Sequence, residues 1–278
     1  MRLVTYEAGS GPRVGLLQDD VVVDAGFDGD MVAFIEAGAP VAGGEPVDGA
    51  RLLAPLRPRT MRDFLAFEGH LEGAYLALGR EIPPEWYEIP AYYKGMPDTV
   101  VGPDAEVPWP AYCDELDHEL ELAAIVGRTV KDVAPDDALD CVFGYTIWND
   151  FSARDVQRRE GAVGMGPGKA KDWDGSNVLG PCIVTADEFD PDDAWMRVRV
   201  NGEVWGEDTT AHMHHTFADM IAYAARSQTL RPGEVIGSGT APGGSGLELD
   251  RRLAPGDVIE MEVEGIGLLR NQIGRPGD

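Results

Sequence analysis

From about residue 100 to its end, this chain is mostly a succession of short strand-like segments separated by Pro, Gly and Asp turns. The clearest of these segments are residues 122–126, 141–148, 195–200, 203–205 and 258–264. One further helix is predicted over 216–227, from apolar residues at helical spacing. Many short strands with few helices favour an all-β or a β-rich α+β domain and argue against a doubly wound parallel sheet.

The first fifty or so residues predict a small strand-rich module. Strands over 2–7 and 13–18 flank a Gly-Ser-Gly-Pro turn, residues 21–24 continue the strands, and a helix over 30–37 ends before Gly38. Prolines after residue 51 indicate the connection between this module and the main domain. We therefore expect a small N-terminal β module over 1–55 and a larger domain over 56–278.

Two further segments carry polar residues of interest. Residues 60–79 predict a helix with an apolar stripe, on which His70 lies. Residues 160–181 are rich in glycine and predict a long loop, either a substrate-covering loop or a plain surface loop. This loop is not a phosphate-binding P-loop, because Lys169 is followed by Ala170 rather than by Ser or Thr.

Three acidic residues lie at the ends of apolar strands. Glu119 and Glu121 lead into the run 122–126, and side chains on a strand alternate, so the two carboxylates point the same way. Buried like charges are costly, so that face is either open to solvent or has a cation between the acids. Asp150 follows the strand over 141–148. Three oxygen ligands suit a hard divalent ion, and the alternative is three solvated surface acids.

The net charge of −26 restricts the partners of the chain. A field of that sign repels nucleic acids and anionic lipids, so we expect neither nucleic acid nor membrane as a partner. No apolar run reaches the length of a membrane span, and the chain opens into a strand-like segment rather than a signal peptide. Three widely separated cysteines suit a reducing compartment, and we expect a cytoplasmic protein.

Several motifs, in order along the chain, resemble those of the fumarylacetoacetate hydrolase (FAH) family. They span about residues 63–274 and include residues 117–127, 144–157, 179–181, 200–202, 230–240 and 253–259. The resemblance implies a β-rich α+β fold, with an FAH-type mixed β-roll or barrel domain over 56–278 as the catalytic domain. It also implies a homodimer.

The resemblance implies a metal centre with four acidic ligands. The family's ligands fall on Glu119, Glu121 and Asp150, the acids that the strand argument selects. Asp63 is the expected fourth ligand, because it begins an Asp-Phe pair seven residues before His70. The ion expected from the resemblance is a divalent metal, with Mg²⁺ preferred over Mn²⁺ or Ca²⁺.

The resemblance also implies the remaining site residues. His70 is the expected catalytic base, and Glu248, in a Leu-Glu-Leu stretch, is expected to orient it. The acylpyruvase branch places this His and Glu three residues apart, and Glu72 lies only two after His70, so that arrangement fits poorly. Three further catalytic groups, which hold the substrate and its developing oxyanion, are expected at Arg154, Gln157 and Lys171. Thr240 is expected to bind a substrate carboxylate, and Tyr93 to be an aromatic substrate contact.

The function implied is metal-dependent hydrolysis of a carbon–carbon bond in a β-diketone or 2,4-diketo acid, with a fumarylacetoacetate- or acylpyruvate-like substrate. A first alternative is a 2-oxo acid isomerase or decarboxylase, of the 2-hydroxy-dienedioate isomerase or oxaloacetate decarboxylase type, which needs the metal but no attack by water. A second is a binding protein that has kept the fold without activity. Leu65 replaces a family tyrosine and residues 160–171 depart from the family pattern, so the substrate stays open.

Overall fold

A mixed sheet of twelve strands forms the centre of the computed structural model, which describes residues 1–77 and 81–276. Its main path has the strand order β4-β3-β2-β1-β14-β12-β11-β17-β6-β7, with β5 added beside β1 and β8 beside β14. A second sheet has the order β16-β15-β18-β19-β9, and β10 pairs with β13. The prediction of a β-rich α+β fold is confirmed, and within the described residues none of the sheets closes into a barrel.

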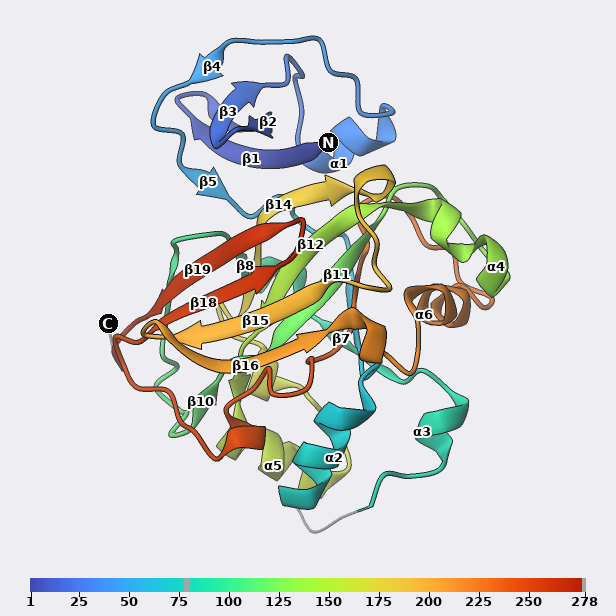
Figure 1. Ribbon diagram of the computed structural model, residues 1–278, viewed down its shortest axis with the longest axis vertical. Coiled ribbons are helices and arrows are strands. Elements are labelled where there is room, and N and C mark those ends of the chain that lie inside the picture. Colours follow the sequence, from blue (N-terminus) through green and yellow to red (C-terminus); the bar gives the residue numbers. More distant parts are fainter. Residues whose placement is uncertain (78–80, 277–278) are drawn as a thin grey trace.

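The elements are spread along the whole chain (Figure 1). The strands are β1 Arg2–Ala8, β2 Gly11–Gln18, β3 Val21–Asp24, β4 Pro46–Val47, β5 Leu52–Leu53, β6 Met61–Phe64, β7 Tyr92–Gly95, β8 Val100–Val101, β9 Glu106–Val107, β10 Leu116–Asp117, β11 Leu120–Val126, β12 Val142–Asp150, β13 Ser152–Ala153, β14 Asn177–Thr185, β15 Trp195–Val200, β16 Glu203–Thr209, β17 Val235–Gly237, β18 Val258–Val263 and β19 Gly267–Ile273. The α-helices are α1 Met31–Glu36, α2 Glu68–Ala77, α3 Glu85–Glu88, α4 Pro135–Ala138, α5 Arg154–Val163 and α6 Phe217–Ala224.

The N-terminal strands form a hairpin-based unit at one end of the molecule, drawn in blue at the top of Figure 1. The predicted hairpin is confirmed as β1 and β2, and the predicted helix as α1. Asp30 caps α1, because its side chain accepts a hydrogen bond from the backbone N–H of Ala33 at 2.8 Å. β1 also pairs with β14, which joins this unit to the large sheet. The division at residue 55 stays a prediction.

The strand β11 is buried at every residue because apolar layers cover both of its faces. Leu122 and Ala124 belong to a core cluster with residues of the second sheet, such as Val198. Ala123 and Ile125 belong to another cluster, which includes residues of α1. A strand covered on both faces cannot alternate apolar and polar residues, which explains the continuous apolar run in the sequence.

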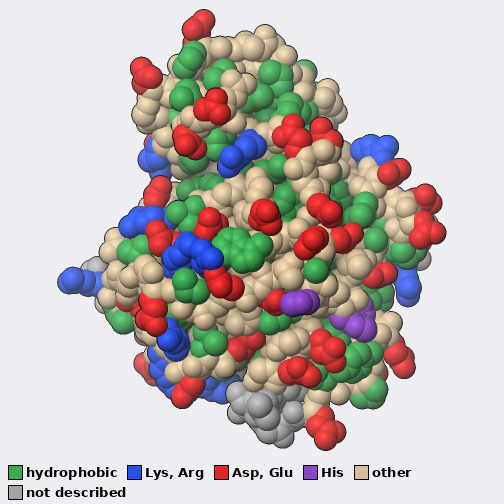
Figure 2. All heavy atoms as spheres, in the orientation of Figure 1, with side chains coloured by type: hydrophobic (Ala, Val, Ile, Leu, Met, Phe, Trp, Pro, Cys, Tyr) green, Lys and Arg blue, Asp and Glu red, His purple; other side chains and the backbone are tan. Residues whose placement is uncertain are grey.

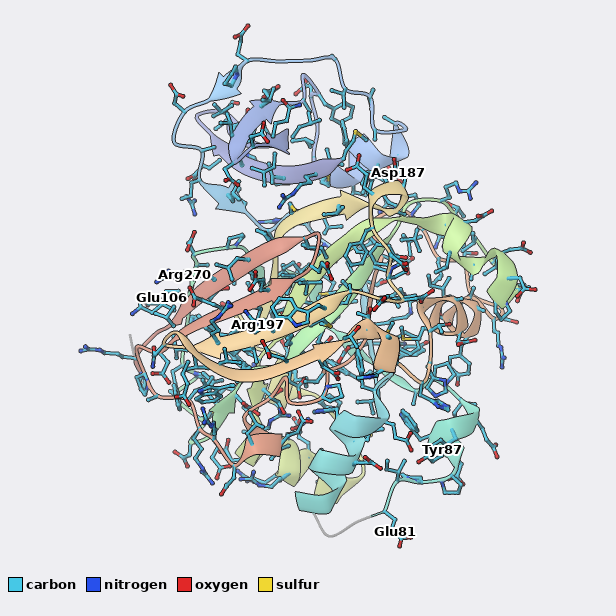
Figure 3. The ribbon with its side chains drawn as sticks, viewed as in Figure 1. Glu81, Tyr87, Glu106, Asp187, Arg197 and Arg270 are labelled. Atoms are coloured by element: carbon cyan, nitrogen blue, oxygen red, sulfur yellow. The ribbon has the colours of Figure 1, made fainter. Side chains whose placement is uncertain are left out.

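The second sheet lies in front of β11 and β12 in Figure 1 and is apolar on its inner face only. Along β15, residues alternate between buried and partly exposed, and Arg197 lies on the outer side. Figure 3 labels Arg197 on β15, with Arg270 of β19 and Glu106 of β9 in the same sheet. Acidic side chains are scattered over the face shown in Figure 2, in keeping with an excess of negative charge that is spread along the chain.

The predicted helix over 60–79 is wrong in its first part. Met61–Phe64 is the strand β6, which pairs in parallel with β17 and antiparallel with β7. The helix α2 begins only at Glu68, and predicted helical residues 78–79 lie outside the described residues. The local spacing fits a helix, but pairing with β17, some 170 residues away, overrides that preference.

The predicted loop over 160–181 is also shorter than expected. Residues 160–163 complete the helix α5, and β14 begins at residue 177. The carboxylate of Glu160 accepts hydrogen bonds from the backbone N–H groups of Gly168 and Lys169 at 2.8 and 2.6 Å, which anchors the connecting segment. Its role in covering a substrate stays a prediction.

The predicted strand over 141–148 is confirmed as β12, which continues to Asp150. The predicted helix over 216–227 is confirmed as the shorter α6, which a capping box between Thr216 and Asp219 begins. Within residues 1–77 and 81–276, every helix is too short or too polar to cross a bilayer.

Candidate metal centre and active site

Three carboxylates converge where neighbouring strands of the large sheet present the same face. Asp63 of β6, Glu121 of β11 and Asp150 of β12 each offer a carboxylate oxygen, and these atoms all lie within 4.8 Å of one another. On each strand, the residue two positions from the acid belongs to the apolar cluster that includes α1. These residues are Met61 on β6, Ala123 on β11 and Trp148 on β12. Since side chains alternate along a strand, the carboxylates share that face.

The cluster fits a hard divalent cation. All three side chains are buried, and burial is the main cause that raises the pKa of Asp63, Glu121 and Asp150, with mutual repulsion adding to it. Both carboxylate oxygens of Glu121 and Oδ1 of Asp150 contact no hydrogen-bond donor among the described residues. Buried acceptors without donors are costly, and a cation with oxygen ligands would satisfy them. Asp63, Glu121 and Asp150 are therefore the residues that would hold it.

Glu119 lies beside this cluster and is already paired with cations. Its carboxylate contacts the ammonium group of Lys171 and lies 2.7 Å from Nη2 of Arg154. Burial alone would raise its pKa, but the charges of Lys171 and Arg154 outweigh burial and lower it. The glutamates at 119 and 121 are both buried, so their face is not open to solvent, and the reading as solvated surface acids is wrong. A direct bond from Glu119 to the metal stays a prediction.

Lys171 is the one ammonium group buried against these acids in the described part of the chain, and it contacts both Glu119 and Asp150. Burial would lower its pKa, but the two carboxylates raise it overall, so the group stays charged. Tyr93 donates a hydrogen bond from its hydroxyl to Oδ2 of Asp150 at 2.5 Å. Its ring centroid lies 5.5 Å from Nζ of Lys171. Tyr93 thus lies against the acidic cluster, and its contact with substrate stays a prediction.

His70 and Glu248 form a buried pair. Nδ1 of His70 lies 3.0 Å from Oε2 of Glu248, an ion-pair distance without the alignment of a hydrogen bond, and both side chains are almost fully buried. Glu248 is held in turn by the backbone N–H of Gly243 at 3.1 Å and by the hydroxyl of Ser245 at 2.9 Å. Gly73 lets α2 approach this turn, because a Cβ there would lie 3.1 Å from Cγ of Glu248. The fold therefore unites two residues that are 178 positions apart.

Arg154 connects the acids to α5. Its Nε donates to Oδ2 of Asp117 at 2.8 Å, and its Nη1 donates to Oε1 of Gln157 at 3.0 Å. The reasoning from sequence did not select Asp117 as a site residue. It also accepts hydrogen bonds from the backbone N–H groups of Gly246 and Leu247, at 2.8 and 3.1 Å, so it ties Arg154 to the turn that carries Glu248. The sequence did hold one signal for Asp117, because this residue lies two positions before Glu119 in the same motif.

Thr240 follows a tight turn that also binds Asp63. The backbone N–H of Gly239 donates to Oδ1 of Asp63 at 3.1 Å. Gly239 has φ +79°, and a Cβ at this position would lie 2.2 Å from the carbonyl oxygen of Phe64, so only glycine fits. Thr240 is buried beside this turn, and its role in substrate binding stays a prediction.

Comparisons with known proteins agree with this architecture. The family model described as "Fumarylacetoacetate (FAA) hydrolase C-terminal" matches residues 59–274. An uncharacterised protein of Pyrococcus abyssi is 35% identical over 199 residues, which cover 72% of this chain and 86% of that protein. The oxaloacetate tautomerase YisK of Bacillus subtilis is 31% identical over 229 residues, which cover 81% of this chain and 73% of the tautomerase.

Two solved structures are similar over nearly the whole chain. The fumarylacetoacetate hydrolase of Exiguobacterium antarcticum has a TM-score of 0.85 and 31% identity, covering 99% of each chain. The 5-carboxymethyl-2-hydroxymuconate delta-isomerase of Mycobacterium smegmatis has a TM-score of 0.80 and 29% identity, covering 99% of this chain and 100% of the isomerase. From its match to the family model and from these relatives, the chain belongs to the fumarylacetoacetate hydrolase family.

Proposed function

We propose that the protein is a divalent-metal-dependent hydrolase that cleaves a carbon–carbon bond in a 2,4-diketo acid. The observation that carries this proposal is the buried pair of His70 and Glu248, with Nδ1 and Oε2 3.0 Å apart. A general base for water is helped by a partner that stabilises its charged form, and a carboxylate beside Nδ1 does so. Nε2 is then the nitrogen that takes a proton from water.

The other residues divide the remaining tasks. Asp63, Glu121 and Asp150 would hold a divalent ion, Mg²⁺ by preference, which supplies Lewis-acid polarisation of substrate oxygens when bound. Lys171 carries a positive charge at the edge of the cluster and offers N–H donors to a developing oxyanion. Arg154 orients Gln157, whose amide provides a further donor.

A second candidate is isomerisation or tautomerisation of a 2-oxo acid at the same centre. Two observations favour it: a relative named as an oxaloacetate tautomerase and a structural neighbour named as a delta-isomerase. Such a reaction moves a proton between carbon and oxygen without attack by water. His70 could serve there as well, so the two candidates differ in whether water enters the product.

Labelled water separates the two candidates. With Mg²⁺ and an acylpyruvate in H₂¹⁸O, hydrolysis places ¹⁸O in the carboxylic acid product, which mass spectrometry detects. Oxaloacetate in D₂O is the parallel test, because tautomerisation exchanges its C3 protons without cleaving the carbon chain. Faster C3 exchange with no labelled acid from any diketo acid tested would contradict the hydrolase proposal and support the second candidate.

Substitutions test the pair directly. His70→Asn and Glu248→Gln should each lower kcat for diketo acid cleavage by about 10²–10⁴-fold, with metal affinity by calorimetry unchanged. The double variant should lose little more than the worse single variant, because residues that act as a unit are non-additive. Glu72→Gln is the matched control, since Glu72 is an exposed glutamate on the same helix. Additive losses, or a His70→Asn enzyme with the wild-type rate, would refute the pairing.

A further inference from the structure

Asp117, on β10, is a buried residue whose two carboxylate oxygens both accept hydrogen bonds. Oδ1 accepts from the backbone N–H groups of His118 and Gly246, at 3.0 and 2.8 Å. Oδ2 accepts from Nε of Arg154 at 2.8 Å and from the backbone N–H of Leu247 at 3.1 Å. Donors from three separate parts of the chain therefore meet on one side chain.

Two of these donors lie directly before Glu248 in the chain. Backbone hydrogen bonds join β11 to the start of the same turn: the N–H of Leu120 donates to the carbonyl oxygen of Gly244 at 3.1 Å, and the N–H of Ala241 donates to that of Leu120 at 2.9 Å. Further along the turn, at residues 246 and 247, the N–H groups donate to the side chain of Asp117 instead. Asp117 thus holds the part of the turn that leads into Glu248.

Gly246 allows the turn to approach this carboxylate. A Cβ at Gly246 would lie 2.7 Å from Oδ1 of Asp117 and 2.6 Å from the carbonyl oxygen of Arg251, and both distances are too short for a carbon atom. The same turn contacts α2, where a Cβ at Gly73 would lie 3.1 Å from Cγ of Glu248. A shift of the turn would therefore move Glu248 relative to α2, the helix that carries the expected base.

The contacts at position 117 require a carboxylate rather than an amide. Each hydrogen-bond partner of Asp117 is a donor, whereas an asparagine has only one acceptor oxygen and would turn its own N–H groups toward at least one of them. Nη2 of Arg154 lies 2.8 Å from Oδ2 of Asp117 and 2.7 Å from Oε1 of Glu119. The guanidinium compensates the buried charge of Asp117, and bonds from N–H groups to a charged acceptor are about twice as strong as neutral ones.

We propose that Asp117 is a positioning residue, which fixes Glu248 against His70 through the backbone of residues 246–247. It acts through Glu248 and touches neither substrate nor metal. Arg154 keeps its contacts with Glu119 and Gln157 when Asp117 is changed, so substrate binding should alter less than turnover. The inference rests on the proposed function only for the role of the His70–Glu248 pair.

Hydrogen–deuterium exchange tests the assignment without turnover. In the Mg²⁺-loaded protein, Asp117→Asn should raise the exchange rate at least about tenfold in peptides that cover 243–251 and 68–74, because the turn and the helix that docks on it lose their anchor. A peptide that covers 195–209, in the second sheet, should exchange at the wild-type rate. Wild-type exchange in the first two peptides of a folded Asp117→Asn protein would overturn the inference.

Asp24→Asn is the matched control. Asp24 also combines a backbone donor with a guanidinium, since it accepts from the N–H of Gly26 at 2.6 Å and from Nε of Arg13 at 2.7 Å. It lies in the N-terminal unit, on β3. Its variant should raise exchange in that unit only and should keep the wild-type kcat.

Turnover separates a positioning role from a general structural one. Asp117→Asn should lower kcat by about 10- to 100-fold and change KM by less than about threefold, with Mg²⁺ affinity by calorimetry unchanged. In the Glu248→Gln background the same change should cost less than about threefold, because residues that act as a unit are non-additive. Equal losses in the two backgrounds would overturn the inference. A rise in KM at constant kcat would do so as well, because Asp117 would then act through Arg154 on substrate binding.

Gly246→Ala is a second variant, which displaces the turn while the carboxylate of Asp117 and its contacts with Arg154 remain. It should raise exchange in the same two peptides and lower kcat by a similar factor. This variant also tests the assignment if Asp117→Asn does not fold. Wild-type exchange and wild-type kcat in Gly246→Ala would contradict it.

The outcomes also separate this inference from the proposed function. If the protein cleaves no diketo acid but exchanges the C3 protons of oxaloacetate, the same variants are compared by that rate, and the hydrolase alone is refuted. If the protein cleaves diketo acids and Asp117→Asn keeps both wild-type exchange and wild-type kcat, the positioning role is refuted and the hydrolase stands.

Discussion

Two glutamates at the start of β11, only two residues apart, have opposite electrostatic surroundings. Glu119 and Glu121 are both buried, so the loss of water alone would raise the pKa of each. Around Glu119, Lys171 and Arg154 reverse that effect and lower the pKa. Around Glu121, the neighbouring groups are the acids Asp63 and Asp150, and the pKa rises well above its usual value.

The difference shows how one strand builds two adjacent sites of different chemistry. Glu119 belongs to a network that the chain neutralises with its own cations, so its charge is compensated in the protein alone. Glu121 pairs with none of the cations in the described part of the chain, and its neighbours are the acids Asp63 and Asp150, of which Asp150 contacts Lys171. A cation from solution would compensate the charge that remains. The acids that would bind a metal are therefore compensated by the chain only in part, through the contact between Asp150 and Lys171.

Removing one uncompensated acid should have the largest effect. Glu121→Gln should abolish turnover, with a loss of more than about 10³-fold, because the cluster loses a ligand of the divalent ion. In the wild-type protein, Mg²⁺ at a hundredfold excess over Kd should add about 2.7 kcal/mol to the free energy of unfolding, and the variant should lose this gain. Thermal melts with and without Mg²⁺ measure it.

The metal-free Glu121→Gln protein should melt no lower than the metal-free wild type, since glutamine replaces a carboxyl group that already favours its neutral form. Glu203→Gln, at an exposed residue of β16, is the control and should keep both turnover and the Mg²⁺-dependent rise in Tm. Full activity of the wild-type protein after exhaustive chelation would refute a metal centre here.

Removing the internal cation should have the next largest effect. Lys171→Met should lower kcat by about 10²-fold or more, because an oxyanion donor is lost. It should also destabilise the metal-free protein by about 3 kcal/mol, since Glu119 and Asp150 lose their buried partner. Bound Mg²⁺ should recover part of that stability. Chemical unfolding in chelator and in Mg²⁺ measures both quantities.

Lys169→Met is the matched control, because Lys169 lies on the same short turn but is exposed. It should change the free energy of unfolding by less than about 0.5 kcal/mol. If both lysine variants lose the same stability, the compensation assigned to Lys171 is wrong.

The pH dependence of metal binding should show the smallest effect. The pKa values of Asp63, Glu121 and Asp150 are raised in the metal-free folded protein. Between the ordinary carboxyl pKa and these raised values, the folded protein therefore keeps protons on these acids, whereas the unfolded chain has released them. Their stabilising effect is complete below the ordinary carboxyl pKa of about 4 and is lost as pH rises through the raised values. Bound metal displaces those protons, so Mg²⁺ affinity should increase from pH 6 to pH 8.

Calorimetry in buffers of different ionisation enthalpy measures the protons released on binding. The wild-type protein should release a measurable fraction of a proton at pH 7, and Lys171→Met should release more, because without the ammonium group Asp150 binds its proton more tightly. Binding that releases no protons and is independent of pH would contradict the raised pKa values.

Local sequence patterns predicted many elements because short-range physics determines them. The β1–β2 hairpin follows from its turn residues, and α1 follows from the Asp30 cap and four apolar residues at helical spacing. The apolar run in β11 indicated a buried strand, and Asp150 was correctly expected at a strand end. The error at residues 60–79 arose where pairing with the distant strand β17 determines the conformation, and the error at 160–181 arose where β14 pairs with β12 from residue 177 onward.

The sequence by itself indicated an acidic, metal-binding type of site. Acidic residues at the ends of apolar strands and the order of the family motifs are local features, so both are visible without the tertiary structure. Only the tertiary structure decided which acids stand together. Asp63 joins Glu121 and Asp150 because β6 is placed beside β17 and β17 beside β11, a pairing that no local spacing encodes. The same holds for the divergence of Glu119 and Glu121. Lys171, 52 residues along the chain, lowers the pKa of Glu119 through space, whereas burial and the acids Asp63 and Asp150 raise the pKa of Glu121.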